Sequence, residues 1–294
     1  MSRFEVAVII ASTGRPESLS TAIRHFSGQS QPPAKIILSV ASPDDLPPDL
    51  ADHPNVLHVI GPKGLPAQRN TGLRSLPAGV EVVAFFDDDY IPSSRCIEDI
   101  AGFFDSHPDV AGATGLLLAD GINSSGISTE DAEALVRRHD AGGETNASIR
   151  KDLEGLYGCN MAFRRSMMDG IWFDERLKLY GWQEDIDFAA QLLGRGRLVK
   201  THAFAGVHQG VKGGRTSGIR LGYAQVINPL YLARKGTMKP LYAGKLIAKN
   251  LLANHAKIWR PEPWVDRSGR VKGNWIAIVD ALRGRLHPER IEAL

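Results

Sequence analysis

Short apolar runs rich in Val, Ile and Leu alternate with longer amphipathic stretches over the first third of the chain. The pattern predicts strands over residues 6–11, 35–40, 55–60 and 80–86, and helices over residues 18–26 and 66–76. Such alternation is typical of βαβ units, in which helices cover both faces of a mainly parallel sheet. Ligands bind beyond the carboxyl ends of the strands in such sheets, so the residues directly after each run are the first candidates for a site.

The pattern is less regular farther along the chain. Residues 116–150 are polar and contain Gly and Ser, apart from a short helical stretch at 130–139, which suggests an insertion. A helix is expected from Glu184 to Gly194, because glycine favours a helix stop. From about residue 235 the sequence is mostly helical in pattern.

These elements predict an α/β protein with a mainly parallel central sheet, helices on both faces and a helical C-terminal extension. Residues 1–118 and 119–234 are expected to form two halves of one domain, and residues 235–294 form the extension. A chain of 294 residues is long enough to bury a substantial core without disulfides or metals as staples.

The composition excludes several classes of protein. Hydrophobic residues at 43% and charged residues at 23% are globular values, and a net charge of +2 argues against a nucleic-acid partner. No 18 apolar residues run together, so no membrane-spanning helix is expected. Two cysteines without metal-ligand spacing fit a reducing compartment. We therefore expect a cytoplasmic protein.

The small net charge hides an uneven distribution. Residues 235–294 hold 12 Lys and Arg against 5 Asp and Glu, a net of +7, which leaves −5 for residues 1–234. Within this basic region, six apolar residues recur at helical spacing while lysines occupy other positions: Tyr242, Leu246, Ile247, Leu251, Leu252 and Ile258. Two interpretations stay open: a helix packed on the core with solvated lysines, or peripheral contact with the inner face of a membrane.

Three consecutive carboxylates directly follow the apolar run 80–86. Side chains alternate along an extended chain, so Asp87 and Asp89 are expected to point to one side and Asp88 to the other. A divalent cation such as Mg²⁺ or Mn²⁺ relieves the repulsion between such carboxylates, and it also binds diphosphate oxygens. The alternative is an acidic turn or the cap of a helix that begins near Ser93.

A second acidic cluster begins the helix predicted at residue 184. Acidic side chains in a first helical turn often only complement the helix dipole. Here Trp182 and Tyr180 lie beside them in the sequence, and a carboxylate next to aromatic walls can act as a general base toward a hydroxyl. Asp185 is the first candidate for that base and Glu184 the second.

A histidine and a glycine-rich segment follow the apolar residues 203–207. His208 alone fits a structural role as well as a metal ligand. Lys212 and Arg215 could close over phosphates, or could belong to a solvated loop. Neither a P-loop motif nor a dinucleotide-binding glycine pattern is present, so those nucleotide folds are not supported.

Taken together, four motifs in order resemble the family 2 glycosyltransferases of the GT-A fold, over roughly residues 4–210. The motifs are STGRP at 12–16, GLPAQRNTGL at 64–73, FFDDD at 85–89 and GWQEDIDF at 181–188. The resemblance implies a GT-A-like fold, with a first half that binds a nucleotide sugar and a second half that binds the acceptor and performs catalysis.

The resemblance also implies roles for individual residues. It implies donor contacts from Thr13, Arg15, Asp44, Arg69, Asp87 and Asp88. Asp89 and His208 are implied as metal ligands, and Asp185 as the catalytic base. Trp182 and Glu184, with residues 158–163, are implied on the acceptor side. Around Asp44 the chain reads ASPD where the family commonly has DDGS.

The reaction implied is transfer of a sugar from a nucleoside-diphosphate sugar to a hydroxyl with inversion, assisted by Mn²⁺ or Mg²⁺. The acceptor is expected to be a saccharide or a lipid-linked molecule in bacterial-type polysaccharide or glycoconjugate synthesis. Two alternatives are a nucleotidyltransferase of the sugar-nucleotide pyrophosphorylase type and a non-catalytic binding protein with a degenerate transferase fold. A nucleotidyltransferase of this type requires a Gly-rich loop after the first strand, where this chain has a single glycine, Gly14.

Overall fold

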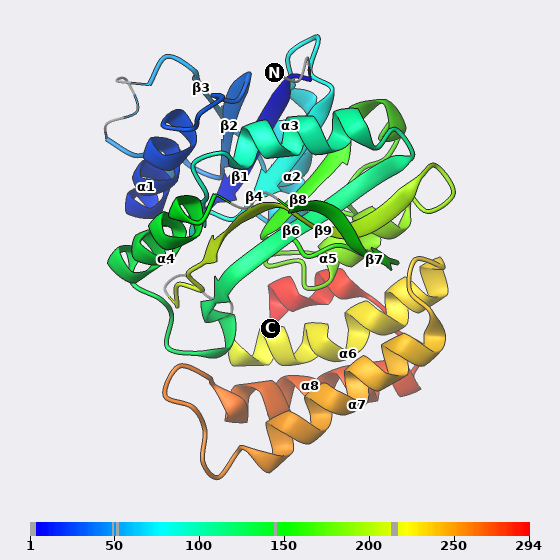
Figure 1. Cartoon of the computed structure of the whole chain (residues 1–294). Helices are drawn as coiled ribbons and strands as arrows, with labels where there is room; N and C mark the ends of the chain where they lie inside the picture. Colours follow the sequence, from blue (N-terminus) through cyan, green and yellow to red (C-terminus); the bar gives the residue numbers. More distant parts are fainter. Residues whose placement is uncertain (1–3, 49, 51–52, 144–145, 213–216) are drawn as a thin grey trace.

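The computed structural model describes residues 4–48, 50, 53–143, 146–212 and 217–294, and these form one mixed nine-stranded sheet with helices around it (Figure 1). The strands are β1 (Val6–Ser12), β2 (Lys35–Val40), β3 (Val56–Ile60), β4 (Val82–Phe86), β5 (Tyr90–Pro92), β6 (Val110–Asp120), β7 (Asn146–Leu153), β8 (Asn160–Arg164) and β9 (Arg197–His208). The α-helices are α1 (Pro16–Ser27), α2 (Leu65–Arg74), α3 (Cys96–Ser106), α4 (Thr129–Ala141), α5 (Glu184–Ala190), α6 (Gly218–Lys235), α7 (Pro240–Ala256) and α8 (Arg267–Leu282).

The first half of the sheet follows the predicted alternation of strand and helix closely. Its strands β3, β2, β1 and β4 are adjacent and parallel. Along β1, Val6, Val8 and Ile10 pack with α1 and α3 on one face, whereas Ala7 and Ile9 pack with α2 and α5 on the other. Alternating apolar side chains on both faces explain why the strand reads as a continuous hydrophobic run.

The second half of the sheet corrects the expectation of an insertion at residues 116–150. These residues include the end of β6, which pairs with β8 and β9, and the start of β7, which pairs with β9. In the first part of β6, before residue 116, glycines weaken the strand pattern because aromatic rings need the space. A Cβ on Gly112 would lie 2.7 Å from the ring of Phe163, and one on Gly115 would lie 2.4 Å from the ring of Phe204.

Helix α5 is shorter than expected, because it ends at Ala190 rather than at Gly194. The chain continues as tight turns in which the amides of Leu192 and Leu193 bond to carbonyls three residues back. Gly194 then takes a left-handed conformation with φ of 97°. The apolar residues therefore keep a helix-like period beyond Ala190, because successive tight turns and an α-helix have nearly the same number of residues per turn.

Helices α6, α7 and α8 form a layer below the sheet in the view of Figure 1. This layer has its own apolar cluster, formed by Tyr223, Val226 and Ile227 of α6 with Ala277 of α8 and Ile291. Helix α6 therefore packs with the C-terminal helices, and the helical layer begins before residue 235. The three-part division at residues 118 and 234 stays a prediction. Among the residues that the structure describes, no helix has the length and hydrophobicity needed to cross a membrane.

Candidate active site

Polar residues at the ends of several strands meet at one edge of the sheet. Strands β1 and β4 are parallel, β8 is antiparallel to both β4 and β6, and β9 is parallel to β6. Strands β1, β4, β6 and β9 therefore run in the same direction. Their carboxyl ends bring together Ser12, Asp87, Asp120 and His208, which is the edge where ligands bind in open α/β sheets.

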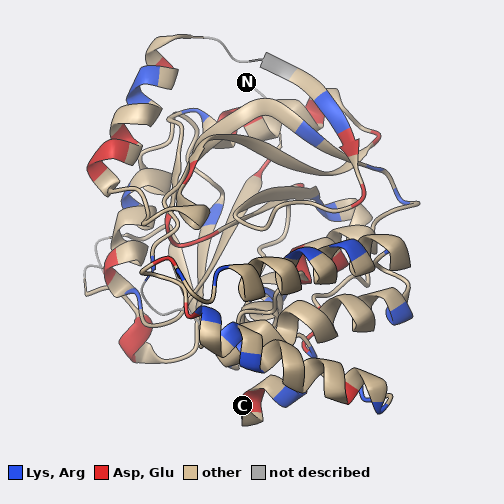
Figure 2. Cartoon of the chain, turned by 90° about the horizontal axis from the view of Figure 1, so that it is seen from below, with Lys and Arg blue, Asp and Glu red and all other residues tan. Residues whose placement is uncertain are grey.

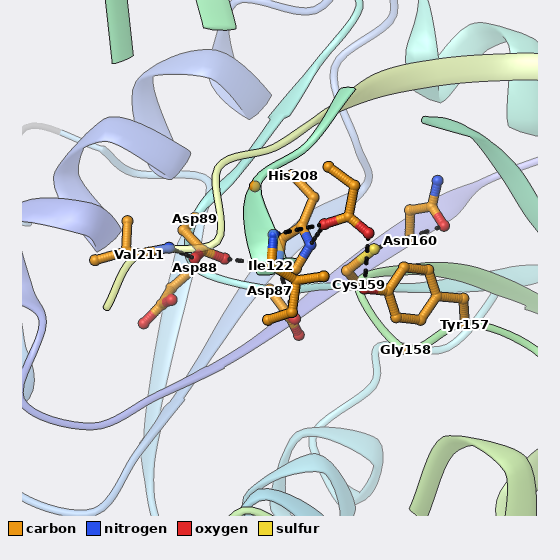
Figure 3. A network of polar contacts seen from close by, with 12 residues as sticks. Asp87, Asp88, Asp89, Ile122, Tyr157, Gly158, Cys159, Asn160, His208 and Val211 are labelled. Carbon is orange, nitrogen blue, oxygen red and sulfur yellow. Dashed lines mark hydrogen bonds and ion pairs between the residues drawn. The ribbon is translucent and has the colours of Figure 1, made fainter. Parts of the chain in front are cut away.

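Asp87, Asp89 and His208 form a compact group of metal-ligand type. One ligand atom from each lies within 4.8 Å of the others, and His208 Nε2 is 3.4 Å from Asp89 Oδ1 and 3.7 Å from Asp87 Oδ2 (Figure 3). Asp87 and Asp89 share this group and Asp88 does not, as predicted, but Asp88 and Asp89 lie in a turn closed by the Tyr90 amide on the Asp87 carbonyl rather than in an extended chain. Two carboxylates and an imidazole suit Mn²⁺ or a similar divalent cation.

A further carboxylate orients the imidazole of His208. Its Nδ1 lies 2.8 Å from Asp120 Oδ1, and an ionised carboxylate can only accept, so Nδ1 carries the hydrogen. This leaves Nε2 toward Asp87 and Asp89, an arrangement that is common around metal-bound histidines. Burial lowers the pKa of His208, but the hydrogen bonds to Asp120 and Asp89 and the charge of Asp87 outweigh burial and raise it to about 10. The group therefore attracts positive charge, so the residues present fit a cation.

Asp88 turns to the other side and meets the loop after β1. Its carboxylate accepts from Ser12 Oγ at 2.5 Å and from Arg15 Nη1 at 2.8 Å. Burial raises its pKa to about 6 despite the attraction of Arg15. Thr13 of the same loop donates to Gln68 Oε1 at 3.3 Å, and the Gln68 amide donates to the carbonyl oxygens at the ends of β1 and β2. The predicted donor residues Thr13, Arg15 and Asp88 thus share one loop region.

Arg69 links the two acidic clusters. Its side chain is only 2% exposed, and it donates to Asp87 at 3.2 Å, to the carbonyl of Gly158 at 2.9 Å and to Glu184. Burial raises the pKa of Glu184, and the charge of Arg69 opposes that rise. Glu184 is 3% exposed and pairs with Arg69, and its expected contact with an acceptor stays a prediction.

Asp185 presents its carboxylate at the start of α5. The side chain is half-buried, and it accepts from the amides of Gly158 at 2.9 Å and Ile186 at 2.8 Å. Burial raises the pKa of Asp185 although both amides favour the charged form. Trp182 is half-buried three residues before it. A carboxylate held by two amides, with a raised pKa, is suited to accept a proton from a bound hydroxyl.

The turn before Asp185 has a backbone that side chains rarely adopt. Leu179, Gly181 and Gln183 have φ values of 59°, 62° and 75°. Helix α6 holds this turn, because Asn228 donates to the carbonyl of Trp182 at 2.8 Å. Such strain persists only where the surroundings over-determine it, and it is common at functional sites.

The end of α6 also anchors α5 itself. Asp187 is 0% exposed, and its carboxylate accepts from Lys235 Nζ at 2.7 Å and from Thr237 Oγ1 at 2.6 Å. Lys235 binds Asp174 as well, at 2.8 Å. Three contacts therefore tie the layer of C-terminal helices to the segment that carries the candidate base.

The loop after β2 carries the predicted donor residue Asp44 and a buried neighbour, Asp45. Asp44 is exposed, and the buried acid in its neighbourhood is Asp45, which accepts from the amides of Gly14, Ala41 and Ser42. Asp45 thereby joins the loops after β1 and β2, and the role of Asp44 stays a prediction.

The glycine-rich segment after His208 is described only in part. Lys212 donates to the carbonyls of Gly121 and Ile122. Arg215 lies outside the described residues.

Sequence reasoning missed two residues beside His208. Asp120 orients the imidazole, and Tyr157 donates to Asp120 Oδ2 at 3.1 Å with its ring 6.1 Å from that of His208. A signal for Asp120 existed, because it directly follows the apolar residues 116–119 in the same way that Asp87 follows its run. Tyr157 had no such signal, since it lies between strands.

The chain belongs to glycosyl transferase family 2, whose profile matches residues 7–172. Its fold is also similar to solved glycosyltransferase structures of the GT-A type. TarS from S. aureus aligns at 15% identity with a TM-score of 0.55 over 99% of this chain and 50% of that one. TarS 1–349 in complex with UDP-GlcNAc aligns at 13% identity with a TM-score of 0.57, over 99% of this chain and 84% of that one.

A third similar structure is the mannosyltransferase PcManGT from Pyrobaculum calidifontis, in complex with GDP-Man and Mn²⁺. It aligns at 16% identity with a TM-score of 0.51, over 98% of this chain and 78% of that one. This chain therefore spans half the length of the first TarS chain, and 84% and 78% of the TarS 1–349 and PcManGT chains. At sequence identities of 13–16%, the similarity to these structures shows a shared fold only. A search of curated protein sequences returned no match.

Proposed function

We propose that this protein transfers a sugar from a nucleoside-diphosphate sugar to an acceptor hydroxyl with inversion at the anomeric carbon. One observation carries the proposal: a metal-type group and a half-buried carboxylate of raised pKa lie on the two sides of Arg69. Arg69 contacts Asp87 of the first and the carbonyl of Gly158, whose amide binds Asp185 of the second. Family membership and the ligands UDP-GlcNAc and GDP-Man in the similar structures support a nucleotide-sugar donor.

In this proposal Asp87, Asp89 and His208 hold a divalent cation, either Mn²⁺ or Mg²⁺. Such a cation stabilises the charge that develops on a departing diphosphate. Arg15 sits beside Asp88, 3.8 Å from Asp89, and adds a guanidinium suited to phosphate oxygens. Thr13 and Asp44 follow β1 and β2, on the side where the nucleoside of the donor would bind.

Asp185 serves as the general base. It takes the proton from the acceptor hydroxyl while the hydroxyl oxygen attacks the anomeric carbon from the face opposite the diphosphate. One base is enough, because positive charge serves the leaving group and no second carboxylic acid has to protonate it. Trp182 supplies an aromatic wall near the acceptor, which we propose is a saccharide or a lipid-linked molecule used in polysaccharide or glycoconjugate synthesis.

The donor class can be identified by thermal shift with a panel of UDP, GDP, dTDP and CMP, each with and without Mn²⁺. Binding to the native state raises the melting temperature. We expect a metal-dependent increase with one nucleoside diphosphate. If no nucleotide stabilises the protein with any metal, the proposed function is wrong and a non-catalytic role gains support. Release of inorganic pyrophosphate from a nucleoside triphosphate and a sugar phosphate would instead favour the nucleotidyltransferase alternative.

Replacing Asp120 tests whether His208 belongs to a metal site. Asp120→Ala removes the acceptor for the Nδ1 hydrogen and should weaken Mn²⁺ affinity by about 10- to 100-fold, the usual effect of losing a carboxylate that orients a metal-bound histidine. Asp120→Asn keeps one acceptor oxygen and should cost less. Calorimetric titration of Mn²⁺ in the presence of the stabilising nucleotide measures both. Asp105→Ala, at an exposed position on α3, is the matched control. Equal affinity in Asp120→Ala and the control would remove His208 from the metal site.

A further inference from the structure

Helices α7 and α8 and the turn between them expose an unusual number of large apolar side chains. Trp259 is 88% exposed, Leu282 84%, Leu241 73% and Leu252 71%. We call this surface the α7–α8 face, and its exposed apolar members are Leu241, Tyr242, Leu252, Trp259, Trp275, Val279 and Leu282. Single exposed apolar residues are ordinary, but a group of this size on one pair of helices indicates a binding surface.

The spacing within each helix places these residues in stripes. On α8, Trp275, Val279 and Leu282 follow one another at intervals of four and three residues, which is one helix face. The rings of His255 on α7 and Trp275 on α8 lie 6.0 Å apart, so the α8 stripe lies directly beside α7. Leu282 also lines a groove of about 530 Å³ between the helices, together with Leu230, Ile247 and Ile278, which extends the apolar surface inward.

The structure divides the apolar pattern of the basic region in two. Leu246, Ile247 and Leu251 pack against the apolar clusters of the helical layer. Tyr242 and Leu252 instead are exposed and share the lysine-bearing side of α7. The helix is therefore packed on the protein along one side, and its other side combines apolar and basic residues.

The exposed charges on the two helices of this face have one sign, and the acids of the turn between them, Glu262 and Asp266, bind Arg267 and the amide of Gly269. Lys245 and Lys249 are exposed on α7, and Lys272 is exposed on α8. Helix α7 contains no Asp or Glu, and the one acid of α8, Asp280, is 1% exposed (Figure 2). Basic residues thus surround the apolar stripes without nearby exposed carboxylates on the same helices.

We propose that the α7–α8 face binds the surface of an anionic lipid bilayer. Tryptophan and leucine side chains enter the boundary between headgroups and acyl chains, while lysines remain at the level of the anionic headgroups. A nucleic acid would use the lysines but not the exposed leucines. A second copy of this chain, related by two-fold symmetry, would bring lysines against lysines. This inference is independent of the proposed function.

Co-sedimentation with two kinds of vesicle tests the proposal: phosphatidylcholine alone, and phosphatidylcholine mixed with phosphatidylglycerol. The full chain should sediment with the anionic vesicles, and salt should weaken the binding because it screens the lysines. The double variant Lys245→Gln/Lys249→Gln should lower the partition coefficient by at least about tenfold. Trp259→Ser/Leu282→Ser should also lower it, because this pair removes inserted apolar area.

Matched controls keep the result specific. Arg137→Gln/Arg138→Gln removes two exposed charges from α4, and Ile60→Ser removes an exposed apolar residue from β3, so both should bind vesicles as the unchanged chain does. Lack of binding to anionic vesicles, or equal binding by all variants, overturns the proposal. So does a dimer, measured by light scattering, that Trp259→Ser/Leu282→Ser converts to monomer while vesicle binding is absent: the face would then belong to a second copy.

Discussion

Asp185→Asn is expected to lower kcat for sugar transfer by about 10²- to 10⁴-fold, the usual contribution of a general base. The amide cannot take the proton from the acceptor hydroxyl. Donor binding should persist, because the metal-type group of Asp87, Asp89 and His208 and the loop after β1 are unchanged. Steady-state kinetics with the donor identified by the nucleotide panel measures the loss, and calorimetry with the nucleoside diphosphate measures binding.

The pH dependence of transfer gives a second measurement of the same role. A base must be ionised to act, and burial raises the pKa of Asp185 above the ordinary value of 3.8. The rate of the unchanged enzyme should therefore fall as the pH is lowered through a pKa higher than that value. Asp105→Asn, an exposed change of the same kind, should leave the rate and its profile unaltered. Full transfer activity in Asp185→Asn would show that another group is the base.

Arg69→Met is expected to lower the free energy of unfolding by about 3 to 5 kcal/mol. The variant leaves Glu184 buried without its cationic partner and removes the donor to Asp87 and to the carbonyl of Gly158. Methionine has a similar length, so the loss reports charge and hydrogen bonds more than volume. Urea unfolding followed by circular dichroism gives the difference in midpoint at a comparable slope.

Two further variants make this prediction specific. Arg74→Met changes an arginine of the same helix that is 57% exposed and pairs with Glu175, and it should cost less than about 1 kcal/mol. Adding Glu184→Gln to Arg69→Met should restore part of the lost stability, because no buried charge is then left unpaired. If Arg69→Met is as stable as Arg74→Met, the buried ion pair does not hold the two acidic clusters together.

The first half of the fold could be predicted from sequence because its signals are local. Strands buried on both faces, such as Val6–Ser12 and Lys35–Val40, are short continuous apolar runs, and no distant residue is needed to recognise them. The second half could not, because β6 and β7 take their register from β9, and glycines at 112 and 115 make room for distant aromatic rings. The strand register and the space that these rings take are determined by residues far apart in the sequence, so they cannot be recognised from the local pattern.

The same distinction applies to the site. The grouping of Asp87 with Asp89 depends only on neighbouring residues, through the turn that the Tyr90 amide closes onto the Asp87 carbonyl, although the chain is not extended there. The true surroundings of Glu184 depend on Arg69, 115 residues earlier, and neither residue's pattern reveals the pairing. The orientation of His208 by Asp120 depends on two parallel strands ending at one level. Strand ends identified the edge of the sheet, and only the packed fold determined which side chains meet there.

The contacts of Asp187 with Lys235 and Thr237 decide how far the chain can be shortened. A truncation that ends the chain at residue 234 would remove the lysine and the threonine that bind a fully buried carboxylate, and would leave it only the Gln191 amide at 3.4 Å. We expect this loss to loosen α5, the helix that carries Asp185. The helical layer is therefore not a detachable module. Exchange of the helical layer alone would separate the turn before Asp185 from the residues that hold it.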